Sequence, residues 1–195
     1  MTTIAELNGK IRDLINHPRK HQELLQDSNT WYMLCSCLDA IGDTELALDA
    51  FLKQCNVGDN GKNYLLIYGA LQALIIQQDA VTQMADALKV NYTQNVILKQ
   101  IREIRNDSIG HLTKRGYKKF KNGSSNRMMR MSLNHHKFVL VKNYPDRHTE
   151  CVDIDVNNLI NNQRSNLTET LTGIVTKLNE DEMSYMPQDT LQKNY

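Results

Sequence analysis

Several features that define common protein classes are missing from this 195-residue sequence. No glycine-rich phosphate loop, nucleotide-binding fingerprint or H-E-x-x-H metal motif occurs in it, so we expect no cofactor. Met1 to Lys10 has neither a basic start nor an apolar core, and we therefore expect no secretory signal. The longest mostly apolar run, from Tyr64 to Ile76, is too short to span a bilayer. These absences together predict a soluble, cytoplasmic protein that contacts no membrane.

Cysteine and histidine residues form no metal-binding or disulfide pattern. The cysteines have neither C-x-x-C spacing nor the density of a disulfide framework, which predicts that they are reduced and mostly buried. His17 and His21 have a metal-compatible spacing for a helix, but Pro18 separates them and no carboxylate or thiol completes a site. We interpret them as surface histidines and expect no metal site. The four cysteines are Cys35, Cys37, Cys55 and Cys151.

Acidic residues are missing between Ser108 and Pro145, although the whole chain has a net charge of only +1. This stretch contains nine of the 23 lysines and arginines, so the remainder has 14 basic against 22 acidic residues and a net charge of −8. The near-zero total excludes a protein that is basic throughout. The acid-free stretch predicts a local basic surface that suits a polyanion such as RNA. A solvated basic loop is the alternative explanation.

Apolar residues recur at helical spacing over most of the chain and predict a mainly α-helical bundle. With 41% apolar residues the chain can bury one core, and we expect a single domain over residues 1–195. In the N-terminal third, Pro18 breaks the first apolar stripe, and Asp27-Ser28-Asn29 offers an N-cap for the next helix. We expect Gly42-Asp43-Thr44 to break and recap that helix.

Two long helices are predicted after a turn-rich connector at residues 53–63. The first spans Tyr64 to Leu88 and is long enough to be a central core element. The second is expected to begin at about Thr93 as its cap, and its apolar face ends with Ile104 and Ile109. The short connection between the two helices predicts that they pack antiparallel.

After His111 the pattern changes, and we expect an insertion in the helical fold at about residues 116–152. A basic, turn-rich segment comes first. Arg127–Leu133 and Lys137–Lys142 are then the predicted strands of an antiparallel β-hairpin, and Glu150–Ile154 is a third short strand. The adjacent His135 and His136 cannot both point one way from a regular strand, so we expect turn residues rather than ligands.

The C-terminal segment returns to a helical pattern. Asp155 is its predicted cap, and an apolar stripe follows that the polar run Asn161-Asn162-Gln163 interrupts. Residues 183–195 are expected to be a loose tail.

A polar cluster stands where the second long helix is expected to end at Gly110. Arg105 offers a permanent, forked positive charge suited to a phosphate, and His111 offers a group that exchanges protons near neutral pH. On an unbroken helix, residues six apart lie about 120° from facing each other. If the glycine lets the chain turn back, the imidazole swings toward the guanidinium. These two groups fill the roles that RNA cleavage through a phosphorane-like transition state requires.

The pattern Arg105-Asn106-x-x-x-x-His111 resembles the motif of the HEPN family, helical domains whose arginine and histidine stand four to six residues apart. In that family a polar residue often follows the arginine. The resemblance implies a metal-independent ribonuclease, usually a homodimer, of the type found in bacterial toxin–antitoxin and phage-defence systems, where an antitoxin protein is a further partner. The β-hairpin is not part of the minimal HEPN core and would be an insertion.

Two function classes are consistent with these residues. The first is a HEPN-type endoribonuclease in which Arg105, Asn106 and His111 are catalytic and the 2′-hydroxyl of the substrate is the nucleophile. The second is a non-catalytic helical module that binds nucleic acid or protein, in which the same residues bind an anion or cap the helix. The predicted RNA-binding residues are Lys114, Arg115, Lys118, Lys119 and Lys121.

Overall fold

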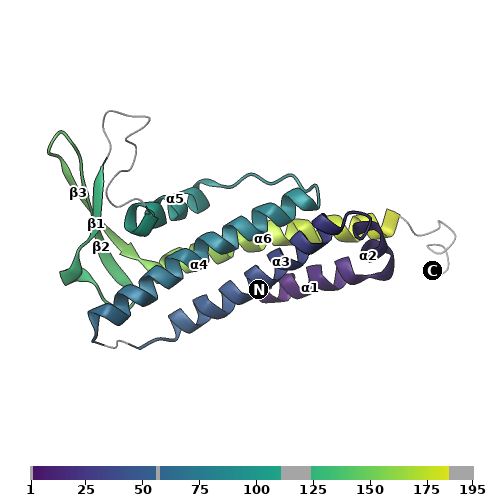
Figure 1. Cartoon of the computed structure of the whole chain (residues 1–195), viewed down its shortest axis with the longest axis horizontal. Coiled ribbons are helices and arrows are strands. Elements are labelled where there is room, and N and C mark those ends of the chain that lie inside the picture. Colours follow the sequence, from purple (N-terminus) through teal and green to yellow (C-terminus); the bar gives the residue numbers. More distant parts are fainter. Residues whose placement is uncertain (1, 56–57, 111–123, 185–195) are drawn as a thin grey trace.

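The computed structural model describes residues 2–55, 58–110 and 124–184. The chain is mainly helical, as predicted, with long helices running side by side and a three-stranded sheet at one end of them (Figure 1). The sheet precedes the C-terminal helix in the sequence, which also agrees with the prediction. The elements are α1 (Ile4–Asn16), α2 (Pro18–Leu24), α3 (Ser28–Leu52), α4 (Asn60–Ala87), α5 (Val96–Arg105), η1 (Asn106–Gly110), β1 (Ser125–Met128), η2 (Arg130–Ser132), β2 (Lys137–Asn143), β3 (Thr149–Asp155) and α6 (Val156–Ser184).

Four helices form the body of the bundle. α3 packs along α4, α1 lies against α6 and α3, and α4 also contacts α6. Ile11, Leu74 and Leu171 are fully buried between these helices, and they belong to the same hydrophobic cluster as Phe138 and Leu140 of the sheet. Bundle and sheet therefore share one continuous core, whose burial stabilises the docking of the sheet.

The N-terminal helices begin and end at the predicted signals, with one exception. α1 ends before His17, Pro18 is the first residue of α2, and the Asp27 carboxylate caps α3 through the backbone N–H groups of Asn29 and Thr30. The predicted break at Gly42-Asp43-Thr44 is wrong, because α3 continues through it. The Thr44 hydroxyl donates to the carbonyl oxygens of Ala40 and Ile41 in the preceding turn, so it caps nothing.

The two helices that follow are antiparallel, as predicted, although both begin elsewhere. α4 starts four residues before Tyr64, capped by Asp59, and α5 is capped by Asn95 rather than Thr93. Their side-chain contacts run in opposite directions along the chain, since Gln72 meets Arg105 and Asp79 meets Arg102. Within the described residues, α4 is the one helix long and apolar enough to cross a membrane, and more than half of its apolar window is buried inside the protein. That burial is typical of a core helix.

The predicted hairpin is present, with a shorter first strand. β1 pairs antiparallel with β2, and β2 pairs antiparallel with β3. Residues 130–132 form a 3₁₀ turn instead of continuing the strand, and the side chain of Met131 in that turn is 97% exposed. The Ser132 hydroxyl accepts from the backbone N–H of Val139, so a side chain replaces the strand partner there. His135 and His136 lie in the bend before β2, as expected.

A layer of buried amides crosses the centre of the bundle. α6 is capped by Asp155, as predicted, and the polar run that interrupts its apolar stripe lies inside the helix. Gln163 is fully buried: its amide nitrogen donates to the Leu74 carbonyl and to Gln77, and its oxygen accepts from Gln78. All three glutamines are thus paired in the core, which satisfies groups whose burial would otherwise be costly.

Candidate functional site

The candidate site lies at the C-terminal end of α5, beside the sheet. α5 buries Leu98 and Ile101 against the bundle, which leaves Arg105 at its last turn partly exposed. The chain then forms one π-helical turn from Asn106 to Gly110. Single π turns require backbone hydrogen bonds between residues five apart and are frequent at functional sites.

Gln72 of α4 holds the guanidinium of Arg105. The Gln72 amide oxygen accepts hydrogen bonds from Arg105 Nε at 3.2 Å and from Nη2 at 2.6 Å. Arg105 Nη1 donates to the Asn106 amide oxygen at 3.0 Å. A guanidinium has five N–H groups, so two of them have no partner among the described residues. Arg105 and Asn106, predicted to act together, are in direct contact.

Gly110 lies against the same guanidinium. A Cβ atom at this position would stand 2.8 Å from Arg105 Nη1 and 3.4 Å from the Asn106 amide oxygen, so only glycine fits without a shift. Gly110 does not have a positive φ. The glycine is therefore required for a close approach, and the chain bends by a π turn instead of the left-handed reversal considered from the sequence.

Asp107, inside the π turn, is a buried carboxylate that sequence reasoning missed. It is 3% exposed, its Oδ2 lies 3.0 Å from Lys142 Nζ, and its Oδ1 accepts from Asn126 Nδ2 at 2.9 Å. Burial alone lowers the pKa of Lys142, but the hydrogen bond and charge of Asp107 outweigh it and raise that pKa above its usual value. Asp107 is the last acid before the acid-free stretch, but that position alone does not indicate burial.

The remaining predicted site residues lie outside the described residues: His111, Lys114, Arg115, Lys118, Lys119 and Lys121. The described chain stops at Gly110 and resumes at Ser124. Asn126, just after this gap, donates a hydrogen bond to Asp107, which lies just before it and two residues after Arg105.

The other histidines and the cysteines form no metal cluster within the described residues. The two neighbouring ring nitrogens of His135 and His136 are 2.6 Å apart, and burial together with the adjacent His135 lowers the pKa of His136, although Asp155 acts in the opposite direction. All four cysteines are free thiols. The expectation that most of them are buried is wrong, because only Cys37 is buried, whereas Cys55 and Cys151 are exposed on the surface.

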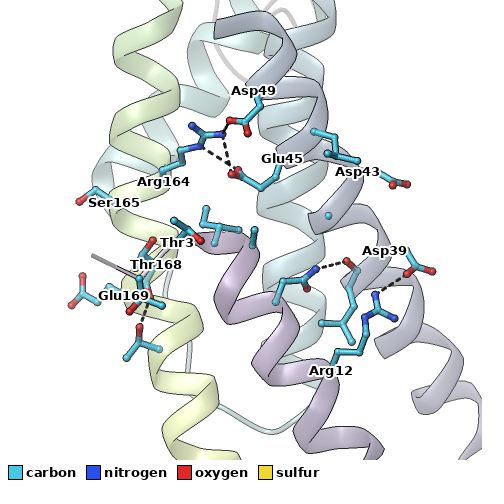
Figure 2. Close-up of a pocket in the computed structure, with 18 of the residues that line it drawn as sticks. Thr3, Arg12, Asp39, Asp43, Glu45, Asp49, Arg164, Ser165, Thr168 and Glu169 are labelled. Carbon is cyan, nitrogen blue, oxygen red and sulfur yellow. Dashed lines mark hydrogen bonds and ion pairs between the residues drawn. The ribbon is translucent and has the colours of Figure 1, made fainter. Parts of the chain in front are cut away.

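A groove of about 1100 Å³ lies between the start of α1, α3 and α6 (Figure 2). Arg164 of α6 reaches across it to Glu45 and Asp49, and Arg12 pairs with Asp39. Five carboxylates and two guanidinium groups line this groove. The excess of negative charge would repel a phosphate backbone.

Comparisons of the chain with protein-family models, with curated proteins and with solved structures found no significant match. The likeness to the HEPN family therefore rests on the Arg105-Asn106 and His111 spacing and on the helical context around it.

Proposed function

We propose that this protein is a metal-independent endoribonuclease of the HEPN type. Arg105 stabilises the charge that develops on the phosphorane, Asn106 orients the phosphate or the histidine, and His111 transfers a proton. The 2′-hydroxyl of the RNA is the nucleophile, so the reaction needs no side-chain nucleophile and no bound metal.

The observation that carries the proposal is the contact between Gly110 and the Arg105 guanidinium. Gly110 directly precedes His111 in the sequence, and the approach of Gly110 to the guanidinium supports a pairing of the two predicted catalytic residues. A straight α-helix would separate these residues, whereas the π turn supports their convergence. The two N–H groups of Arg105 that have no partner among the described residues then suit a phosphate held in the fork geometry that guanidinium prefers.

Substrate binding in this proposal uses the basic segment after the motif. Lys114, Arg115, Lys118, Lys119 and Lys121 follow the RNA backbone beside Arg105. The hydrogen bond from Asn126 to Asp107 supports this, since it joins the described residues that precede and follow the segment. A role as a toxin or phage-defence effector, restrained by an antitoxin protein, follows from the family resemblance alone.

A non-catalytic module that binds RNA or another anion is the second candidate function. One observation favours it: three N–H groups of Arg105 already donate hydrogen bonds to Gln72 and Asn106. This is typical of an arginine whose role is to stabilise the end of a helix. Such a module would bind RNA and leave it intact.

The test is incubation of the purified chain with total RNA in the presence of a chelator. We expect cleavage products that end in a 2′,3′-cyclic phosphate, and His111→Ala should lower the rate by about 100-fold or more while the helical circular dichroism is retained. His148→Ala, which removes an exposed histidine of the β2–β3 turn, is the matched control. RNA binding without cleavage would support the second candidate, and dependence on added Mg²⁺ would point to another class of nuclease.

A further inference from the structure

The three-stranded sheet is joined to the motif by one buried carboxylate. Asn126 of β1 and Lys142 of β2 are direct cross-strand partners in the sheet. They bind different oxygens of Asp107, which lies two residues after Arg105 in the π turn. One side chain from β1 and one from β2 thus bind the π turn that connects Arg105 to Gly110.

Because Asp107 is buried, its contacts with Asn126 and Lys142 matter more for stability than the same contacts would on the surface. A carboxylate withdrawn from water is costly unless charge and hydrogen bonds compensate it. Asp107 has both, and Asn126 is itself 4% exposed, so the contact lies inside the protein rather than on its surface. A surface ion pair would contribute little, whereas here the loss of one partner leaves a buried group unpaired.

The position of this π turn also determines which groups lie beside the Arg105 guanidinium. Asn106 at the start of the turn accepts from Arg105 Nη1, and Gly110 at its end packs against the same nitrogen. A shift of the turn would therefore change the distances from Arg105 Nη1 to both of these residues. The carboxylate that holds the turn therefore affects the Nη1 side of the guanidinium, whereas Gln72 holds the Nε and Nη2 side.

We propose that Asp107, bound by Asn126 and Lys142, is a positioning residue for Arg105. In this proposal the sheet contributes to the site by supplying the two side chains that hold Asp107 in place. The inference deepens the proposed ribonuclease function and rests on it for its catalytic consequence. Small displacements of groups that bind a reacting phosphate cost rate steeply. The proposal therefore gives the three-stranded sheet a role, which is to hold Asp107 in the position that Arg105 requires.

The test uses the double variant Asp107→Asn, Lys142→Met in the full chain, because it removes both charges and leaves no unpaired ion in the core. Lys137→Met, which removes a more exposed lysine of β2 from its ion pair with Asp155 of β3, is the matched control. We expect the double variant to fold, to show a displaced or broadened Arg105 Nε–H resonance in its nitrogen-15 NMR spectrum, and to lose about 10- to 100-fold in kcat on an RNA oligonucleotide. The Lys137→Met control should leave both the Arg105 Nε–H resonance and kcat unchanged.

An unchanged Arg105 resonance and kcat in the folded double variant would overturn the inference. If the double variant does not fold, Asn126→Ala gives the same readouts, since it removes one hydrogen bond and no charge. The NMR signal requires no activity: a wild-type chain that never cuts RNA would refute the proposed function, whereas the Arg105 resonance would still decide whether Asp107 positions it.

Discussion

Gln72 and Arg105 connect α4 to α5 through a neutral acceptor: one amide oxygen receives hydrogen bonds from both Nε and Nη2 of the guanidinium. This contact fixes the plane of the fork and, because the acceptor is neutral, adds no negative charge beside it. A carboxylate at position 72 would fix the same plane and cancel the charge. A glutamine at this position therefore suits the anion-binding role that we propose for Arg105.

The first prediction is that Gln72→Glu weakens anion binding. The new carboxylate pairs with Arg105, so phosphate must compete with it, and we expect RNA affinity to fall about 10-fold or more while the fold is retained. Gln83→Glu, which adds the same charge at an exposed position of the same helix, is the control. Fluorescence anisotropy with a labelled oligonucleotide measures both, and equal losses would mean that only net charge matters.

The helices and strands were largely predictable, because apolar periodicity and caps act locally. Pro18, Asp27 and Asp155 mark helix ends that the structure confirms. Gly42-Asp43-Thr44 misled the prediction, since a glycine inside a helix costs only about 1 kcal/mol relative to alanine and packing against α1 and α4 offsets it. The 3₁₀ turn at residues 130–132 depends on the Ser132 contact across the hairpin, which no local pattern encodes.

The site was half predictable for the same reason. Arg105 and Asn106 are neighbours in sequence, so their contact follows from local spacing. Gln72 and Asn126 come from distant segments, and only the packing of α4 and β1 brings them to the motif. A buried role for Asp107 could not be read from the sequence, where an acid beside a basic stretch usually means a solvated charge.

The second prediction concerns the amide layer in the bundle. Gln163→Met has nearly the same length but cannot pair with Gln77 or Gln78, so buried groups lose their partners. We expect the free energy of unfolding in urea to fall by about 2–4 kcal/mol. Asn162→Met, at the neighbouring exposed position of α6, should change it by less than about 0.5 kcal/mol. A Gln163→Met protein as stable as the wild type would show that the layer is energetically neutral.

The third prediction is a loss of the cap of α6 in acid. Burial raises the pKa of Asp155, but hydrogen bonds from Lys137 and from the backbone N–H groups of Asn157 and Asn158 outweigh it and hold the pKa below its usual value. The stability that the carboxylate contributes is therefore present above the unfolded pKa of about 3.9 and is lost as pH falls through the folded pKa.

Asp155→Ala should accordingly cost about 1 kcal/mol of stability at pH 7 and much less near pH 2.5. Asp153→Ala, at an exposed position of β3, should cost little at either pH. Urea titrations at the two pH values measure the difference. A cost for Asp155→Ala that is the same at both would mean that the ionised form has no special role.

The fourth prediction concerns the salt dependence of RNA binding. If Lys114, Arg115 and Lys118 contact phosphates, each releases counterions on binding, and neutralising all three should reduce the slope of log affinity against log salt by about 2 for single-stranded RNA. Lys10 lies on α1, Lys53 at the end of α3 and Lys62 on α4, all outside the basic segment, and a triple glutamine variant there is the control. An unchanged slope in the first variant would show that the basic segment does not touch RNA.

The last prediction concerns assembly. A single Arg105 and a single His111 are a sparse set for charge stabilisation and proton transfer on both sides of a phosphorus, and a two-fold axis beside the motif would bring two sets to one basic groove. Exposed Leu65, Tyr68 and Ile76 of α4 lie within about 40° of Gln72 around the helix, so an apolar stripe flanks the site. We expect a homodimer that packs through this stripe.

Leu65→Asp should therefore convert the dimer to a monomer in light scattering and reduce ribonuclease activity in parallel. Leu46→Asp is a close control, because Leu46 is 71% exposed, Leu65 is 73% exposed, and Leu46 lies on α3 in the acidic groove. Both variants place the same charge on an exposed leucine of a long helix, so only the location differs. A monomeric wild type with full activity, or a dimer that survives Leu65→Asp and dissociates with Leu46→Asp, would place the two motifs apart and exclude a shared site.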